Sequence, residues 1–117
     1  MLKLYNTLTK SEEIADFTSK EVKIYLCGPT VQSSPHIGHG RSAVVFDFLV
    51  RYLNYTGKEV VFARNITDID DKIIEKSLEQ GITHNELTTK VSKEFNEAYS
   101  ALNCKIPNHE PKATESI

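Results

Sequence analysis

The hydrophobic positions of this 117-residue chain change their period along its length, and each change predicts an element. Residues 2–7 read as a short strand, and residues 21–27 alternate apolar and polar side chains as a half-buried strand does. Residues 58–64 form a third expected strand. Between the last two, apolar residues recur at helical spacing, which predicts a helix from about Gly38 to a stop near Gly57. Such a strand–helix–strand unit requires a parallel sheet with a right-handed connection.

The remainder of the pattern predicts helices and connecting segments. A helix is expected over residues 68–80, with acidic residues at its start and Gly81 after its end. Thr83 and Glu86 have the spacing of a capping box at the start of another helix. The apolar face of that helix contains Leu87, Val91, Phe95, Ala98 and Leu102. Residues 11–20 are expected to form a loop with one helical turn, residues 103–111 a linker, and residues 112–117 the first turn of a further helix. The expected fold class is therefore α/β, in a single domain over residues 1–117.

Composition limits the function classes. The content of 39% hydrophobic and 26% charged residues is ordinary for a soluble globular protein, and the net charge of −2 excludes a broadly basic nucleic-acid surface. We expect no membrane partner, since no apolar run reaches the length of a membrane span, and a cytoplasmic location, since the N-terminus lacks a signal peptide's apolar stretch. The two cysteines, Cys27 and Cys104, are expected to be reduced thiols or metal ligands rather than a disulfide.

The most informative segment joins the second expected strand to the helix, and it contains Pro35-His36-Ile37-Gly38-His39-Gly40-Arg41. A helix that begins just after a strand directs free backbone N–H groups and its positive dipole end into the space above the sheet. Gly38 leaves room for a flat ligand, and His36 and His39 add hydrogen-bond donors. This arrangement suits the triphosphate of a nucleotide.

Four blocks of this sequence resemble the cysteinyl-tRNA synthetases, a family of class I aminoacyl-tRNA synthetases. They are Leu2 to Leu8, Cys27-Gly28-Pro29-Thr30-Val31, His36-Ile37-Gly38-His39, and Arg64-Asn65-Ile66-Thr67-Asp68-Ile69-Asp70-Asp71-Lys72. The resemblance continues to residues 110–114 and implies a Rossmann-like parallel sheet with crossover helices. Many family members have Tyr-Asp or Tyr-Asn where this chain has Gln32-Ser33, a difference in the loop over the expected site.

The resemblance also implies an activity and roles for individual residues. The intact enzyme would activate L-cysteine with ATP to cysteinyl-adenylate and transfer the cysteinyl group to tRNA(Cys). His36 and His39 would be catalytic, and the ATP site would include Pro35, His36, Gly38 and His39. Gly28, Thr30 and Thr67 would bind the amino acid. Cys27 would bind Zn²⁺ together with a later Cys, His and Glu that have no counterpart here, so zinc is expected to be weak or absent in this chain. For Asp68, Asp70 and Asp71 we expect helix capping, with Thr67 or Asp68 as the cap itself.

Other functions stay open at this point. The family's Lys-Met-Ser-Lys-Ser motif is absent, so the chain is expected to be the N-terminal piece of a monomeric enzyme, a truncated nucleotide-binding half-domain inactive alone. The alternatives are the cysteine ligase of mycothiol synthesis, a small nucleotidyltransferase with a His-x-Gly-His motif, and a non-catalytic nucleotide-binding fragment. Arg41, Arg51 and Arg64 are too scattered to indicate a tRNA patch and are expected to be solvated or salt-bridged. No metal-binding spacing surrounds Cys104 and His109, and His84 is expected in a capped first turn.

Overall fold

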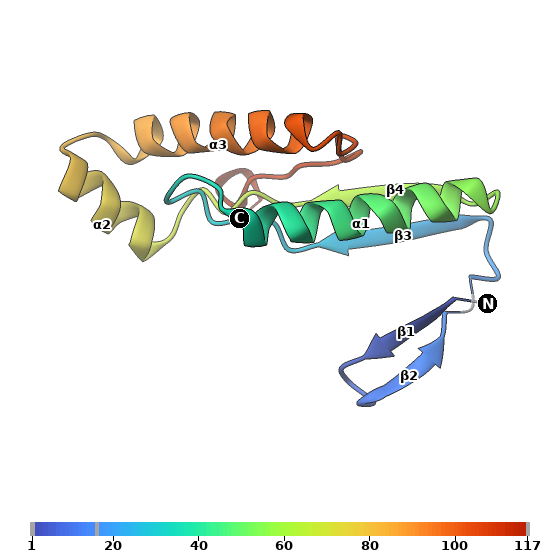
Figure 1. The fold of residues 1–117 in the computed structure, drawn as a ribbon. Coiled ribbons are helices and arrows are strands. Elements are labelled where there is room, and N and C mark those ends of the chain that lie inside the picture. The colour runs from blue at the N-terminus through green and yellow to red at the C-terminus, as the bar shows by residue number, and fades with distance from the viewer. Residues whose placement is uncertain (1, 16, 117) are drawn as a thin grey trace.

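A computed structural model describes residues 2–15 and 17–116, and it is an α/β structure built around one strand–helix–strand unit. Strand β3 (Glu21–Leu26) pairs in parallel with β4 (Glu59–Arg64), and helix α1 (Ile37–Tyr55) connects them (Figure 1). The register runs from Glu21 opposite Glu59 to Leu26 opposite Arg64. The parallel pair and its crossover helix confirm the prediction from the sequence. The sheet proper has two strands, which is narrower than the expected Rossmann-like sheet.

The C-terminal segment extends this small sheet without forming a regular strand. Isolated parallel bridges join Ala63 to His109 and Ile66 to Lys112, and the N–H of Arg64 donates to the carbonyl of His109 at 3.0 Å. The expected linker therefore lies along β4. It ends in the short 3₁₀ helix η1 (Ala113–Glu115), which takes the place of the expected first helical turn.

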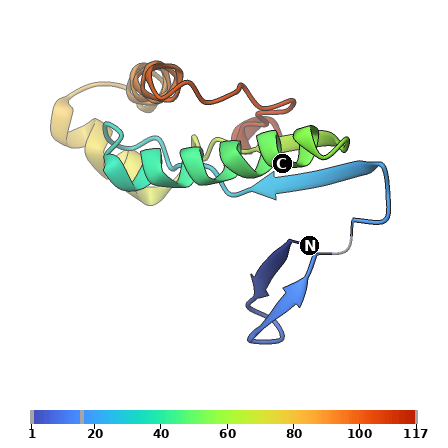
Figure 2. The same ribbon diagram turned by 45° about the vertical axis from the view of Figure 1, so that its right-hand side comes forward.

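A separate hairpin at the N-terminus corrects one prediction. Strand β1 (Lys3–Asn6) confirms the strand expected over residues 2–7. It pairs antiparallel with β2 (Ser11–Ile14), a segment where a loop with one helical turn was expected. Asn6 explains the difference, because its side-chain oxygen accepts from the N–H of Leu8 at 3.0 Å and its side-chain amide donates to Glu13 at 3.1 Å. Both views show the hairpin extending away from the other elements (Figures 1 and 2). Asp16 and Ile117, which fall in expected segments, lie outside the described residues.

Helix α2 (Asp71–Gln80) and helix α3 (His84–Ala101) follow β4, and their ends show how the sequence sets helix boundaries. The capping box of Thr83 and Glu86 is confirmed, with the N–H of Glu86 donating to the Thr83 hydroxyl at 3.2 Å and Thr83 N–H to the Glu86 carboxylate at 2.9 Å. Gly81 ends α2 in the left-handed conformation, as expected. The start of α2 is three residues later than predicted.

The main buried cluster lies where α2 and α3 meet the loop after β3. It consists of Val31, Ile73, Leu87, Val91 and Phe95. Helix α1 packs against β4 and buries a different set, Ala43, Val50 and Leu53. Four of the apolar residues whose spacing predicted α1 are instead exposed, namely Val44, Val45, Phe48 and Tyr52. A two-stranded sheet covers only one side of a 19-residue helix, so the apolar spacing identifies the helix but not its buried face.

The helices within residues 2–15 and 17–116 are α1, α2, α3 and the short η1. None of them is long and apolar enough to cross a membrane.

Candidate functional site

A pocket of about 310 Å³ lies at the carboxyl ends of β3 and β4, beside the start of α1. Open α/β sheets bind ligands at this edge, because the connections that leave the strands diverge there. The pocket brings together four of the residues singled out from the sequence, Cys27, Gly28, Thr30 and His39. Its other lining residues are Leu26, Pro29, Gln32, Ser42, Ala43, Arg64 and Tyr99.

The loop after β3 is held closely against the loop after β4. The N–H of Gly28 donates to the side-chain oxygen of Asn65 at 2.7 Å. Thr30 and Thr67 form a parallel bridge, with Val31 N–H donating to the Thr67 carbonyl at 3.1 Å. A Cβ on Gly28 would lie 1.6 Å from the carbonyl oxygen of Asn65, so only glycine fits. Thr67 thus supports the loop from behind and does not line the pocket.

His36 and His39 cap helix α1 reciprocally. The N–H of Gly38 donates to Nδ1 of His36 at 3.1 Å, and the N–H of His36 donates to Nδ1 of His39 at 3.1 Å. This is a capping box in which imidazoles replace the usual hydroxyl and carboxylate. The ring centroids are 3.9 Å apart, and the His39 ring meets Phe95 of α3 edge-on with centroids 4.9 Å apart. Both rings are therefore fixed before any ligand binds.

The caps also determine where each imidazole carries its proton. A neutral ring whose Nδ1 accepts a hydrogen bond must hold its proton on Nε2. Partial burial is the main cause that lowers the pKa of His39, and the electrostatic effect of the neighbouring His36 is a smaller one. Both favour this neutral form. Two Nε2–H donors thus flank the helix start, where the free backbone N–H groups lie.

Two further residues predicted to bind ATP lie beside this cap. Pro35 is half-buried in the loop before α1, and Gly38 is exposed in the first turn. A Cβ on Gly38 would lie 2.9 Å from Cε1 of His36, so a larger residue would displace the ring. Neither Pro35 nor His36 lines the pocket itself.

Arg64 is the pocket residue whose importance the sequence did not reveal. Its side chain was expected to be solvated or salt-bridged at the surface. The salt bridge is present, since the guanidinium donates to Glu110 at 2.6 Å, but the residue is only 5% exposed. The guanidinium carbon lies 4.1 Å from the ring centroid of Tyr99. Burial raises the pKa of the Tyr99 hydroxyl. No local pattern around Arg64 indicates its burial, since its partners lie 35 and 46 positions further along the chain.

The acidic cluster after β4 has structural roles that differ in detail from the prediction. Asp70, not Thr67 or Asp68, caps α2, because its carboxylate accepts from the N–H of Lys72 at 2.9 Å. Asp68 instead accepts from the N–H of Thr114 at 3.0 Å and from its hydroxyl at 2.6 Å. Burial raises the pKa of Asp68, but these hydrogen bonds outweigh burial and lower it overall.

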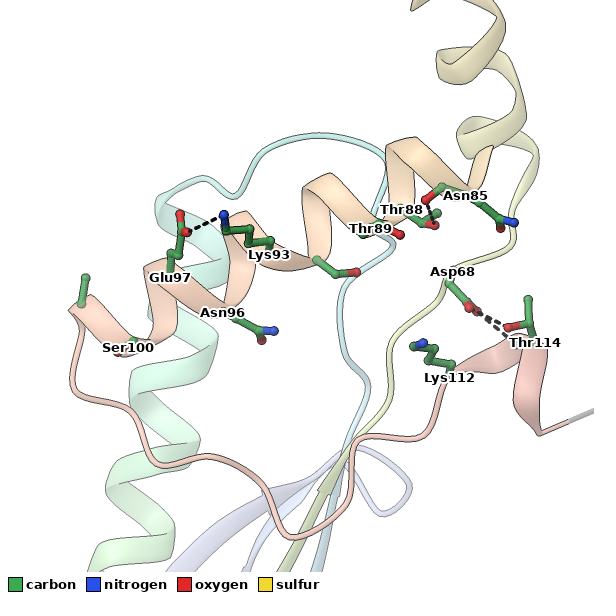
Figure 3. Close-up of a pocket in the computed structure, with 12 residues that line it drawn as sticks. Asp68, Asn85, Thr88, Thr89, Lys93, Asn96, Glu97, Ser100, Lys112 and Thr114 are labelled. Carbon is green, nitrogen blue, oxygen red and sulfur yellow. Dashed lines mark hydrogen bonds and ion pairs between the residues drawn. The ribbon is translucent and has the colours of Figure 1, made fainter. Parts of the chain in front are cut away.

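Asp68 and Thr114 border a wider polar groove of about 1130 Å³ along α3 (Figure 3). Its lining is mostly hydroxyl and amide side chains, with Lys93 paired to Glu97 and Lys112 on the opposite side. The groove contains neither histidine of the cap nor Cys27. Although the groove is larger than the pocket at Cys27, it lacks the imidazole donors that suit the phosphates of a nucleotide.

The donor atoms of the described residues near Cys27 are too few for a zinc site. A structural or catalytic zinc site needs three or four protein ligands, usually thiolate and imidazole. Over residues 2–15 and 17–116, no group of three His, Cys, Asp or Glu side chains is placed to hold a metal ion. Cys27 contributes one exposed thiol. The described residues alone do not make up a zinc site.

Comparison with known proteins assigns the family. Residues 13–117 match the family model described as tRNA synthetases class I (C) catalytic domain. The chain belongs to this family of class I tRNA synthetases. Among curated relatives, the cysteine–tRNA ligase of Vibrio vulnificus (strain YJ016) is 49% identical over 118 residues, which cover 100% of this chain and 26% of that protein.

Other relatives of the synthetase family give the same name. The cysteine–tRNA ligase of Shewanella loihica is 48% identical over 118 residues, covering 100% of this chain and 26% of the relative. That of Rickettsia bellii is 50% identical over 117 residues, covering 97% of this chain and 26% of the relative. The chain therefore spans about a quarter of the length of the curated relatives that it matches.

Proposed function

We propose that this chain is the part of a cysteine–tRNA ligase that binds ATP and L-cysteine. The observation that carries the proposal is that His39 at the reciprocal cap and Cys27 line one pocket at the carboxyl ends of two parallel strands. The names of the relatives favour this function over the mycothiol-pathway ligase and over a stand-alone nucleotidyltransferase.

In the proposed reaction, an oxygen of the cysteine carboxylate attacks the α-phosphorus of ATP. The bond from that phosphorus to the bridging oxygen breaks, pyrophosphate leaves with the electron pair, and cysteinyl-adenylate remains. A hydroxyl of tRNA(Cys) then attacks the acyl carbon, and AMP leaves. The protein needs no nucleophile of its own, because the substrate supplies one.

The contribution of this chain to the first step is electrostatic. The Nε2–H groups of His36 and His39 and the free N–H groups of α1 are donors held in place by the cap. Donors fixed where negative charge develops stabilise a transition state without reorganisation, typically by a few kcal/mol each. We place the phosphates at this helix start, against Pro35 and Gly38, and the amino acid at Cys27, Gly28 and Thr30, with Thr67 behind them.

The remaining features of the proposal concern the larger assembly. We propose that the parallel pair β3–β4 belongs to a Rossmann-like sheet and that further parts of a monomeric, cytoplasmic enzyme hold tRNA(Cys) and complete a zinc site at Cys27. Both proposals rest on the family and on the share of the relatives that this chain spans.

The test replaces the 118 matched residues of the Vibrio vulnificus ligase with this chain and measures cysteine-dependent ATP–pyrophosphate exchange. We expect exchange in the chimera, and a fall in kcat of about 100-fold in its His39→Ala variant with little change in KM for ATP. His39→Gln keeps a capping side chain at the third helical position and serves as the matched control for helix stability. A folded chimera without exchange, beside an active parent enzyme, would refute the proposal.

A further inference from the structure

The buried arginine at the end of β4 packs against the loop after β3, against α3 and against the C-terminal segment. Its Cγ lies 3.1 Å from the position that a Cβ on Gly28 would occupy, so the stem of Arg64 supports the backbone of the loop after β3. Its guanidinium stacks on Tyr99 of α3 and pairs with Glu110 of the C-terminal segment. Arg64 and Tyr99 both line the pocket that contains Cys27.

Arg64, Tyr99 and Glu110 form a cluster whose geometry requires arginine. The ion pair of 2.6 Å is largely shielded from water, with the side chains of Arg64 and Glu110 exposed by 6% and 24%. Only a planar guanidinium can stack on an aromatic ring and donate to a carboxylate at its edge at the same time. Lysine would keep the charge but lose the stack. The cluster therefore fixes the relative positions of β4, α3 and the C-terminal segment at one wall of the pocket.

One donor of the cluster has no partner. In the described part of the chain, the Nε atom of Arg64 is buried and donates no hydrogen bond to a protein atom. Buried donors in native proteins are nearly always paired, with protein or with ordered water. Arg64 and Tyr99 line the pocket that contains Cys27 and also a second pocket, which contains Glu110.

We propose that Arg64 is a positioning residue for the amino-acid half of the site, acting through Tyr99 and Glu110 on the wall beside Cys27 and Gly28. This inference rests on the proposed function and adds a residue to it. The hydrogen bonds that cap α1 on the phosphate side are formed by His36 and His39 and involve none of the three residues of the cluster. The His39 ring reaches Tyr99 only indirectly, through Phe95, which contacts both. Loss of the cluster should therefore affect cysteine and spare ATP.

The experiment titrates the 117-residue chain separately with L-cysteine and with ATP, following backbone amide resonances by NMR. In Arg64→Lys we expect affinity for cysteine to fall by about 10-fold and affinity for ATP to change by less than about 2-fold. The amide resonances of Cys27, Gly28 and Thr30 should shift in the free protein, and those of His36 and His39 should not. Glu110→Gln should change the same quantities in the same direction while leaving the arginine in place.

Arg51→Lys is the matched control, since Arg51 forms an ion pair of the same 2.6 Å length with Asp47 but lies outside the pocket. It should leave both affinities unchanged. The inference is overturned if Arg64→Lys leaves cysteine binding intact, weakens cysteine and ATP equally, or unfolds the chain together with Glu110→Gln. It is also overturned if the parent chain binds ATP but not cysteine. A folded parent chain that binds neither ligand, together with a folded chimera that shows no exchange, would instead overturn the proposed function.

Discussion

Replacing Gly28 by alanine tests the close contact on which the pocket depends. The new Cβ would lie 1.6 Å from the carbonyl oxygen of Asn65 and 2.8 Å from its carbonyl carbon. Both are backbone atoms, so no side-chain rotation relieves the overlap. The two loops must separate by about 1.8 Å to restore an ordinary contact of 3.4 Å. Because the φ angle of Gly28 is not in the left-handed region, the whole effect is steric.

The structure also sets the size of the effect. Overpacking alone costs about 1–3 kcal/mol. Separation of the loops also weakens three hydrogen bonds, from Gly28 to Asn65, from Val31 to Thr67 and from Thr67 to Pro29. At about 0.5–1.5 kcal/mol for each bond lost, we expect the free energy of unfolding to fall by about 2.5–7.5 kcal/mol in total. That is a large part of the 5–15 kcal/mol typical of a domain.

Urea unfolding followed by circular dichroism measures this change, with Gly81→Ala as the control. Gly81 has a φ of 65° and open space around its Cα, so alanine there meets backbone strain without overlap and should cost about 1–2 kcal/mol. Gly28→Ala should also weaken L-cysteine binding more than ATP binding. If Gly28→Ala is no more destabilising than Gly81→Ala, the loops after β3 and β4 do not pack as closely as the structure shows.

Four further predictions concern the caps, the isolated chain and its metal content. Since the pKa of His39 is lowered, the folded state should lose stability as pH falls below about 6.5, the ordinary value for histidine, and His39→Gln should reduce this loss in acid unfolding experiments. In ¹⁵N NMR spectra at neutral pH, His36 and His39 should both show a protonated Nε2 and an unprotonated Nδ1, and a protonated Nδ1 would contradict the caps. The purified chain should catalyse no cysteine-dependent ATP–pyrophosphate exchange above buffer. Elemental analysis should find no stoichiometric zinc in it, because one thiolate holds the metal too weakly, and tightly bound zinc would show that Cys27 has nearby partners.

The sequence by itself determined the features whose causes are local. The helix stop at Gly81 and the capping box of Thr83 and Glu86 depend on residues within one turn of each other, and both are confirmed. The strand–helix–strand unit was also predictable, since apolar periodicity and the right-handed connection leave one parallel arrangement. The motif around His36 and His39 indicated a ligand at a helix start, and the structure places that motif at the carboxyl edge of the sheet.

Only the tertiary structure decided features that depend on partners distant in sequence. The second strand of the hairpin was missed because residues 11–14 are exposed and mostly polar, and the side chain of Asn6 rather than burial fixes their turn. The exposed apolar face of α1 could not be recognised, because spacing shows that a helix is amphipathic but not which elements cover it. Arg64 shows this dependence most clearly. A charged side chain can be buried when stacking and an ion pair replace its hydration. For Arg64 these partners are Tyr99 and Glu110, which come into contact with it only after the chain has folded.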